Sequence, residues 1–340
     1  MHDKKYVIGV DCGNSKTHYA LVDSEGNLMN FLQRGTSSHE NLSDGFPGMK
    51  RELDKQFTSL LNNNGLNYSD IDFIVLGMAG IDRKIQHQHA CEIISELGFK
   101  KFIVSNDAYL GIKAGSMNKY GVCSINGAGT CCVAIDPYNN SIQLGGLGST
   151  FGDDAGALHM GAMVIRRTYE YCFRNGISTI MTELLFEELG IVDENDLVDA
   201  VYEKVFSRQI QLGILSKIIF IAANQGDKAA IELLRETGIN LAQAVLGAIN
   251  KLDYSSVDAI DIILAGSVYI KGEHPALLDA FKNEVIKHVK AKVNFILLNI
   301  PPVTGAILWA LENVYGELPG QIRDIVIKNI SHMKQTKEFE

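Results

Sequence analysis

The chain has 340 residues, of which 46% are hydrophobic and 21% charged, and its formal net charge is −9. This length and composition describe a globular protein with room for two domains. The negative charge argues against a nucleic acid as partner, because binding a phosphate backbone requires a basic face. No apolar run approaches the eighteen or so residues that span a bilayer, and the chain enters its first strand too early to accommodate a signal peptide.

The first third of the chain predicts a meander of three strands followed by two helix–strand units. Turn residues bound the strands, and apolar residues spaced three and four apart mark the helices. Strands are expected at residues 6–10, 19–22, 28–33, 73–76 and 102–104, and helices at residues 45–63 and 85–97. The runs 73–76 and 102–104 are apolar throughout, as in central strands that are buried on both faces.

The same arrangement recurs in the remainder of the chain. Strands are expected at residues 120–125, 131–135, 141–144, 261–265 and 293–298, with helices dominating 154–252 and further helices at 275–290 and from about 303. The clearest helix is 228–252, with Asp227 as its N-cap, and the polar tail 331–340 is expected to fray. The repeat predicts an α/β protein of two lobes, residues 1–116 and 117–340, with a hinge near Gly115.

A glycine-containing turn follows the first strand of each half. The first turn is Asp11-Cys12-Gly13-Asn14-Ser15-Lys16-Thr17, and the second is Asn126-Gly127-Ala128-Gly129-Thr130. Because glycine lacks a Cβ atom, backbone N–H groups can approach phosphate oxygens closely there. The hydroxyls of Ser15, Thr17 and Thr130 would add donors. The ordered pair of turns predicts a nucleotide held in a cleft between the two lobes.

Asp11 has two interpretations. An aspartate in a turn often bonds its own backbone. With a second glycine turn in the chain, we favour the alternative that Asp11 holds Mg²⁺ or its waters beside the phosphates of ATP, with Lys16 as a nearby cation.

Asp107 follows the apolar run 102–104 and precedes a short helical pattern. It could cap that helix. However, the carboxyl ends of strands are where α/β sheets place groups that face ligands. An acid there can accept the proton of a substrate hydroxyl that attacks the γ-phosphate.

Residues 145–156 are glycine-rich and contain Asp153 and Asp154 just before a long helix. We expect one of the two to cap that helix and the other, preferably Asp153, to bind hydroxyls of a polar substrate. Gly266-Ser267 and Gly305 lie at strand-to-helix turns, where glycine serves either close backbone packing or a shelf for adenine and ribose.

Six motifs in register resemble one family. They are Asp-x-Gly-x-Ser-x-Thr, Ser-Asn-Asp-Ala, Asn-Gly-Ala-Gly-Thr, Gly-Asp-Asp-Ala-Gly, Leu-Ala-Gly-Ser-Val and Pro-Val-Thr-Gly-Ala, between about residues 6 and 312. The chain thereby resembles the BadF/BadG/BcrA/BcrD ATPase family, which includes N-acetylglucosamine kinase and belongs to the actin/Hsp70/hexokinase ATPase superfamily. The resemblance implies two ribonuclease-H-like lobes that close on Mg-ATP.

The resemblance also implies roles for individual residues. Asp107 would be the catalytic base. Nucleotide and metal contacts would come from Asp11, Gly13, Asn14, Ser15, Lys16, Thr17, Gly127, Gly129, Thr130, Gly266, Ser267 and Gly305, with Asp11 as the metal ligand. Substrate contacts would come from Ser38, His39, Glu40, Asn41, Asp107, Ala128, Gly146 and Asp153.

The chain departs from the family pattern mainly on the sugar side. Cys12 and Asn14 stand where glycines are usual, and Ala128 replaces a threonine. Ser38 stands where a sugar-contacting asparagine is common, although Asn41 could align there, and Leu147 replaces a frequent tryptophan. We therefore expect an ATP-dependent kinase for an amino sugar. O6 of N-acetylglucosamine is the favoured acceptor, and N-acetylmuramic acid and glucosamine are alternatives.

Two other classes fall within this resemblance. An ATPase activator of a 2-hydroxyacyl-CoA dehydratase or benzoyl-CoA reductase would hold an iron–sulfur cluster, but no cysteine follows Cys172. A sugar-sensing regulator would carry a helix-turn-helix extension. The six cysteines include no Cys-x-x-Cys pair and are typical of buried thiols in a reducing compartment. We expect a cytoplasmic protein without membrane partners, with a homodimer left open.

Overall fold

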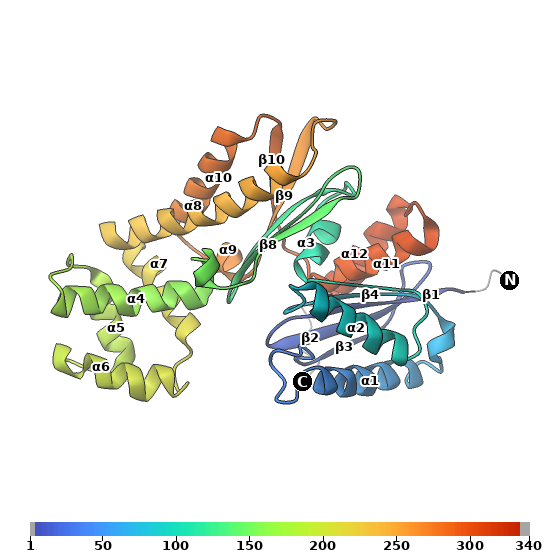
Figure 1. Cartoon of the computed structure of the whole chain (residues 1–340), viewed down its shortest axis with the longest axis horizontal. Coiled ribbons are helices and arrows are strands. Elements are labelled where there is room, and N and C mark those ends of the chain that lie inside the picture. Colours follow the sequence, from blue (N-terminus) through green and yellow to red (C-terminus); the bar gives the residue numbers. More distant parts are fainter. Residues whose placement is uncertain (1–3, 334–340) are drawn as a thin grey trace. The chain divides into compact units, whose positions relative to one another are not determined.

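The structure, a computed structural model, describes residues 4–333. It divides into two compact units (Figure 1): unit 1 is the chain up to Lys119 together with the chain from Leu298 onward, and unit 2 is Tyr120–Leu297. The boundary expected near residue 116 lies close to the first crossing. The expected second lobe, 117–340, differs from unit 2 because the last helices pack on the sheet of unit 1.

The sheet of unit 1 has the strand order β3-β2-β1-β4-β5. Its strands are β1 (Tyr6–Cys12), β2 (Lys16–Asp23), β3 (Leu28–Gly35), β4 (Ile71–Met78) and β5 (Phe102–Ser105). The first three strands form an antiparallel meander, and β4 and β5 then add in parallel beside β1. The carboxyl ends of β1, β4 and β5 therefore lie at one edge of the sheet.

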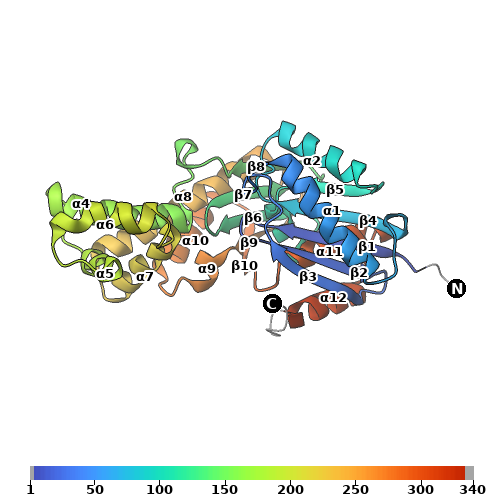
Figure 2. The ribbon, with the colours of Figure 1, turned by 90° about the horizontal axis from the view of Figure 1, so that it is seen from below.

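Helices cover both faces of this sheet (Figure 2). They are α1 (Phe46–Asn62), α2 (Lys84–Glu96), α3 (Ala108–Gly115), α11 (Val303–Tyr315) and α12 (Gly320–Met333), with a short 3₁₀ turn η1 (Tyr68–Asp70) before β4. On α1, Met49, Leu53 and Phe57 recur at helical spacing and are fully buried on one face of the sheet. Helices α3, α11 and α12 contribute to the core on the other face.

Unit 2 repeats the topology, with strand order β10-β9-β6-β7-β8. Its strands are β6 (Gly121–Asn126), β7 (Thr130–Ile135), β8 (Ser141–Gly145), β9 (Ala259–Ala265) and β10 (Lys292–Leu297). Again three strands form an antiparallel meander, and two strands add in parallel. The predicted repeat is confirmed, and the two glycine turns occupy equivalent β1–β2 and β6–β7 connections.

The helices of unit 2 share one core with its sheet. They are α4 (Gly156–Phe173), α5 (Ile180–Leu189), α6 (Leu197–Ala200), α7 (Ser216–Asn224), α8 (Lys228–Lys251), α9 (Ser267–Lys271) and α10 (Ala276–His288). Short turns complete them: the 3₁₀ turns η2 (Ser149–Phe151), η3 (Glu194–Asp196) and η5 (Leu212–Leu215), and the π-helix η4 (Val201–Phe206). Asp227 caps α8 as predicted, its Oδ1 accepting the Ala230 N–H at 2.8 Å.

The C-terminal helices close unit 1, and α12 is a correction to the expected last helix from 303. The residues 331–333, expected to fray, end α12, and the remaining tail 334–340 lies outside the described residues. Arg323 of α12 donates to the carbonyl oxygens of Ser116, Ala114 and Lys113 at 2.7–3.4 Å, and so satisfies the C-terminal end of α3.

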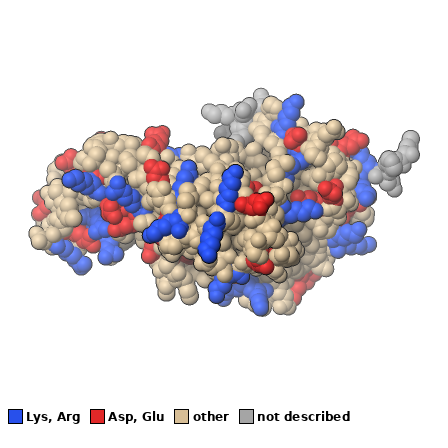
Figure 3. All heavy atoms as spheres, turned by 90° about the horizontal axis from the view of Figure 1, so that it is seen from above, with Lys and Arg blue, Asp and Glu red and all other residues tan. Residues whose placement is uncertain are grey.

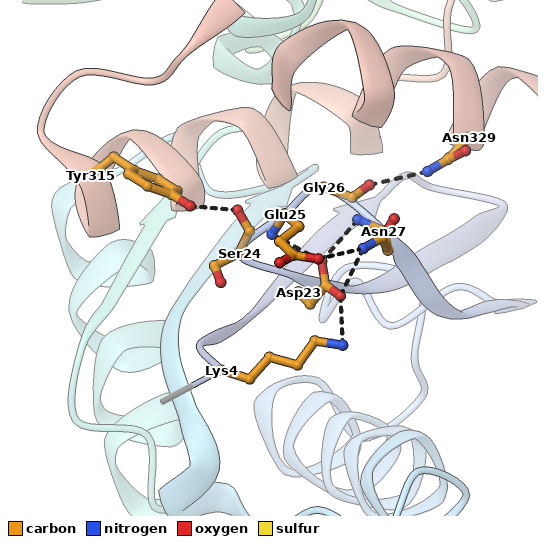
Figure 4. A network of polar contacts seen from close by, with 8 residues as sticks. All are labelled: Lys4, Asp23, Ser24, Glu25, Gly26, Asn27, Tyr315 and Asn329. Carbon is orange, nitrogen blue, oxygen red and sulfur yellow. Dashed lines mark hydrogen bonds and ion pairs between the residues drawn. The ribbon is translucent and has the colours of Figure 1, made fainter. Parts of the chain in front are cut away.

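Figure 4 shows how the same helices hold the β2–β3 turn. Tyr315 of α11 donates to the Ser24 carbonyl at 2.6 Å, and Asn329 of α12 donates to the Gly26 carbonyl at 3.1 Å. Inside the turn, Asn27 Nδ2 donates to Asp23 Oδ2 at 3.0 Å, and Lys4 pairs with the same carboxylate at 2.9 Å. Within residues 4–333, no helix combines the length and the apolar character needed to cross a membrane.

Candidate active site

Three aspartates gather where the parallel strands of unit 1 end. Asp11 lies near the end of β1, Asp82 follows β4 by four residues, and Asp107 follows β5 by two. Asp11 and Asp82 both raise the pKa of Asp107 through their charges. Three strands far apart in sequence thus bring their acids to one place, as expected for the ligand-facing edge of an α/β sheet.

Asp107 does not cap α3. It stands at the N-cap position without a capping hydrogen bond, and the neighbouring Asn106 Oδ1 instead accepts the Ala108 N–H at 2.9 Å. Burial of the carboxyl, followed by the charges of Asp11 and Asp82, raises its pKa to about 7. A carboxyl with this pKa can exchange a proton near neutral pH.

Asp11 pairs with a histidine on the adjacent strand. His18 Nδ1 lies 3.5 Å from Asp11 Oδ2, and His18 Nε2 lies 2.9 Å from Gln33 Oε1. The ring also packs beside Phe31, with a centroid distance of 5.5 Å. The Asp11 side chain is 14% exposed, so it is not fully enclosed.

A divalent ion could bind at this edge of the sheet together with ATP, but not in a site made by side chains alone. Among the described residues, no group of three or more His, Cys, Asp or Glu side chains is arranged to hold a metal ion. Mg²⁺ bound with ATP does not need such a cage, since it takes one or two carboxylates together with phosphate oxygens and waters. The Asp11 carboxylate, which is not fully enclosed, suits that limited role. All six cysteines are free thiols.

The first glycine turn is a tight hairpin with an exposed tip. Gly13 N–H donates to the Lys16 carbonyl at 3.0 Å, and Asn14, Ser15 and Lys16 are exposed. Thr17, expected to contact phosphate, lies below this tip. Its side chain is fully buried, its hydroxyl contacts Cys12 Sγ at 3.4 Å, and it accepts the Ser37 N–H at 2.9 Å. Every residue of β2 after Lys16 is buried, and the Thr17 hydroxyl is engaged inside unit 1.

The segment 36–41 packs between that hairpin and the end of β4. Thr36 Oγ1 donates to the Gly13 carbonyl at 2.8 Å, and Asn41 Nδ2 donates to Asn14 Oδ1 at 2.9 Å. Ser38, expected to contact sugar, is fully buried and donates to the Ala79 carbonyl at 3.0 Å. Asn41 is the exposed amide of the segment.

His39 and Glu40 lie in the same segment with different surroundings. His39 stacks on Phe46 at a centroid distance of 4.1 Å, and burial lowers its pKa. Glu40 is exposed, and its side chain covers Gly80, where a Cβ would come within 2.6 Å of Glu40 Cδ. Gly80 also has φ +82, a backbone conformation that favours glycine. Both its backbone conformation and the close Glu40 side chain therefore require glycine at this position.

In unit 2, the second glycine turn meets the start of α4. The carbonyls of Gly127 and Ala128 accept the N–H groups of Ala157 and Leu158 at 2.8 and 3.0 Å. At Gly156 a Cβ would come within 2.7 Å of the Gly129 Cα, so only glycine allows this contact. Ala128 and Gly129 are exposed at the tip, while the Thr130 hydroxyl donates to the Ile125 carbonyl at 2.9 Å.

Neither acid of the 145–156 segment caps α4, contrary to expectation. Asn126 Oδ1 accepts the Gly156 N–H at 2.9 Å and supplies the cap from the neighbouring strand. Asp153 Oδ2 accepts two backbone N–H groups, of Leu147 and Gly148, both at 2.7 Å. Asp154 Oδ1 lies 3.6 Å from His159 Nδ1. Asp153 therefore holds the glycine-rich loop, and Gly146 is exposed within it.

The two remaining glycines pack against backbone. At Gly266, with φ +102, a Cβ would meet the Asn126 carbonyl oxygen at 2.4 Å, and Ser267 beside it is exposed. Gly305 lies inside α11 in unit 1, and its Cβ would meet the Leu110 carbonyl oxygen at 2.0 Å. It is buried where α11 packs closely on α3, in line with the close-packing alternative for this glycine.

Sequence reasoning does not single out Asp82, Asn106 or His18. The position of Asp82 shortly after a buried strand is the same signal that marks Asp107, and it would have been enough to find it. His18 depends on the β1–β2 register, which pairs it with Asp11, and a sequence pattern does not reveal that pairing.

The family comparison agrees with this arrangement. The model of the BadF/BadG/BcrA/BcrD ATPase family matches residues 8–310. The chain belongs to this family. Membership implies the use of ATP, and the match covers both glycine turns and all three aspartates of the unit 1 edge.

Individual relatives carry related names. A curated relative from Clostridium acetobutylicum, N-acetylmuramic acid/N-acetylglucosamine kinase, is 25% identical over 265 residues, which cover 78% of this chain and 85% of the relative. N-acetyl-D-glucosamine kinase from Dictyostelium discoideum is 23% identical over 319 residues, covering 91% and 99%. A crystal structure of a candidate N-acetylglucosamine kinase from Chromobacterium violaceum has a TM-score of 0.69 at 21% identity, covering 91% and 99%. This similarity shows that the two chains share a fold.

Proposed function

We propose that this family member is an ATP-dependent amino-sugar kinase, with O6 of N-acetylglucosamine as the favoured acceptor. The observation that carries the proposal is the Asp107 carboxyl. It lies at the carboxyl end of β5, takes no part in capping, and has a pKa raised to about 7 by burial, Asp11 and Asp82. The names of the relatives, all of them kinases of N-acetylated amino sugars, support the substrate class.

In this proposal Asp107 is the general base. An ionised carboxylate next to the acceptor hydroxyl takes up its proton as the oxygen attacks the γ-phosphate. A base with a pKa near neutrality is strong enough to accept the proton, and it is half ionised at a pH equal to its pKa and largely ionised one unit above it. The negative charges of Asp11 and Asp82 raise the affinity of the Asp107 carboxylate for a proton.

Phosphate contacts come from the two glycine turns. The exposed tip Asn14–Lys16 of unit 1 and the exposed tip Ala128–Gly129 of unit 2 offer backbone N–H groups, and Lys16 adds a positive charge. Asp11 would hold Mg²⁺, which supplies neutralisation of phosphate charge when bound. Ser15 and Thr130 complete the expected set, whereas the buried Thr17 and Gly305 support the fold. Gly266 and Ser267 are assigned to the adenosine side.

Sugar contacts are assigned to exposed or half-exposed groups beside these turns. Glu40, Asn41 and His39 of unit 1, and Gly146 and Ala128 of unit 2, are the proposed residues, with Asp153 shaping the glycine-rich loop. Leu147 is 48% exposed and smaller than tryptophan, which favours acceptance of the lactyl group of N-acetylmuramic acid. That sugar is the second candidate substrate.

The decisive experiment is a coupled ADP-release assay. It compares N-acetylglucosamine, glucosamine, N-acetylmuramic acid, N-acetylmannosamine and glucose at equal concentration, with Mg²⁺ present and then chelated. Sugar-dependent ADP release supports the proposal, and the ratios of kcat/KM rank the acceptors. If none of the five sugars stimulates ADP release, the protein is not an amino-sugar kinase.

The proposal includes two further elements that the assay does not address. We place the enzyme in the cytoplasm, where ATP and free thiols such as the six cysteines are found. Analytical ultracentrifugation tests for a homodimer, whose molar mass would be twice the 37.3 kDa of the chain.

Figure 3 shows one face of the molecule, on which Lys and Arg side chains occur among Asp and Glu side chains. On that face the charges are mixed.

A further inference from the structure

Asn106 holds the backbone directly after Asp107. Its side chain sits in the turn between β5 and α3 and is 5% exposed. Oδ1 accepts the Ala108 N–H at 2.9 Å, while Nδ2 donates to Asp82 Oδ1 at 2.9 Å. One amide thus ties the residue after Asp107 to the loop that follows the neighbouring strand β4.

Asp82 is itself held from a second element. Gln86, in the first turn of α2 and 6% exposed, accepts the backbone N–H groups of Arg83 and Asp82 through Oε1 at 2.8 and 3.2 Å. Gln86 Nε2 lies 3.4 Å from His39 Nε2. A continuous set of polar contacts therefore connects the segment 36–41, the start of α2 and the turn that carries Asp107.

We propose that Asp82 and Asn106 are positioning residues that hold the Asp107 carboxyl at the angle required for phosphoryl transfer. The inference rests on the proposed function, because it concerns the base of that reaction. Asn106 uses both amide atoms inside the protein, so it acts on Asp107 through the turn. Small displacements of a catalytic group are costly, since a shift of about 1 Å can lower a rate about a hundredfold.

The sharpest test is an exchange of the two side chains. Asn106→Asp removes the Nδ2 donor and places a second carboxylate opposite the Asp82 carboxylate, where the 2.9 Å hydrogen bond had been. Adding Asp82→Asn restores the bond in the opposite direction: the amide introduced at position 82 donates to the carboxylate introduced at position 106, whose other oxygen accepts the Ala108 N–H. The pair then carries the same total charge as in the wild type.

We expect Asn106→Asp to lower kcat by about tenfold to a hundredfold, with the KM values for ATP and sugar changed by less than about twofold, the pattern of a positioning defect. The double variant should recover at least half of that loss on a logarithmic scale. Asp82 is half-exposed in its loop, and Asp82→Ala should lower kcat as much as Asn106→Asp does. Asp82→Asn keeps an acceptor oxygen for Asn106 and should lower kcat much less.

A matched control exists at the opposite edge of the same sheet. Asn27 Nδ2 donates to Asp23 Oδ2 at 3.0 Å (Figure 4), so Asn27→Asp creates the same clash far from the three aspartates. It should lower the melting temperature and leave kcat unchanged. Melting temperatures of all variants, measured together, separate lost folding from lost turnover.

The outcomes are distinguishable. If Asn106→Asp and Asp82→Ala keep normal kcat, the positioning role is wrong. If Asn106→Asp loses activity and the exchange restores none of it, the Asp82 part is wrong. If the wild type phosphorylates no sugar, the proposed function fails and takes this inference with it.

Discussion

The ammonium of Lys113 lies 2.9 Å from the carboxylate of Glu312, in a pair whose side chains are 7% and 16% exposed. Lys113 belongs to α3 and Glu312 to α11, so the pair joins two helices of unit 1 that are far apart in sequence. The ammonium also lies 5.3 Å from the centre of the Trp309 ring. A charge buried this deeply depends on its partner.

Breaking this pair should therefore be costly. We expect Lys113→Met to lower the free energy of unfolding by about 3–5 kcal/mol, because it leaves the Glu312 carboxylate buried and unpaired. Denaturant titration measures the change. Lys50→Met is the control, since Lys50 and Glu96 are 47% and 59% exposed, and its effect should stay below about 1 kcal/mol. Equal effects would contradict the prediction.

Removing the base should separate chemistry from binding. Asp107→Asn is expected to lower kcat by about 10²–10⁴-fold, the range for losing a general base. The Kd for ATP, measured by calorimetry, should stay nearly unchanged. Near-normal turnover would exclude Asp107 as the base.

The raised pKa of Asp107 predicts the acid limb of the activity profile. Asp107 must be ionised to accept a proton, so kcat/KM for the sugar should fall about tenfold per pH unit below its pKa of about 7. Rates measured between pH 5 and 9 check this. A profile that stays flat down to pH 5 would contradict the assignment.

The same pKa has a consequence for stability. The unfolded carboxyl ionises near 3.8, whereas the folded one keeps its proton to about 7, so its contribution to stability is lost as pH rises through that window. Asp107→Asn should thus melt at a higher temperature than the wild type at pH 8, with the difference vanishing near pH 4. Asp44→Asn should give no such gain, because Arg51 lowers the pKa of Asp44.

Gly305 should not tolerate a methyl group. A Cβ would meet the Leu110 carbonyl oxygen at 2.0 Å, so Gly305→Ala must displace α11 or α3. We expect a loss of about 1–3 kcal/mol in stability and a lower kcat, since α3 follows Asp107 directly. At Gly320, in the first turn of α12, no atom lies within 4 Å of the added Cβ. Gly320→Ala should be neutral or stabilising by up to about 1 kcal/mol.

Local signals in the sequence were sufficient for the repeated strand meanders, the two glycine turns and the Asp227 cap. Each depends on residues a few positions apart. Long-range contacts decide the rest. Thr17 and Ser38 are buried by bonds to other segments: the Thr17 hydroxyl accepts the Ser37 N–H, and the Ser38 hydroxyl donates to the Ala79 carbonyl. Asn126 of β6 takes the capping role expected of Asp153 or Asp154. Likewise, the last helices join unit 1 through contacts such as that of Arg323 with α3.

Unit 1 is built from two stretches of chain that are separated by the whole of unit 2. During synthesis, β1 to β5 leave the ribosome with Val7, Val22 and Val75 facing helices that do not yet exist. Unit 2 is continuous and can fold while α11 and α12 are still being made. One apolar face of the N-terminal sheet therefore stays partly uncovered until α11 and α12 have been made, and apolar surface exposed in this way during folding favours aggregation.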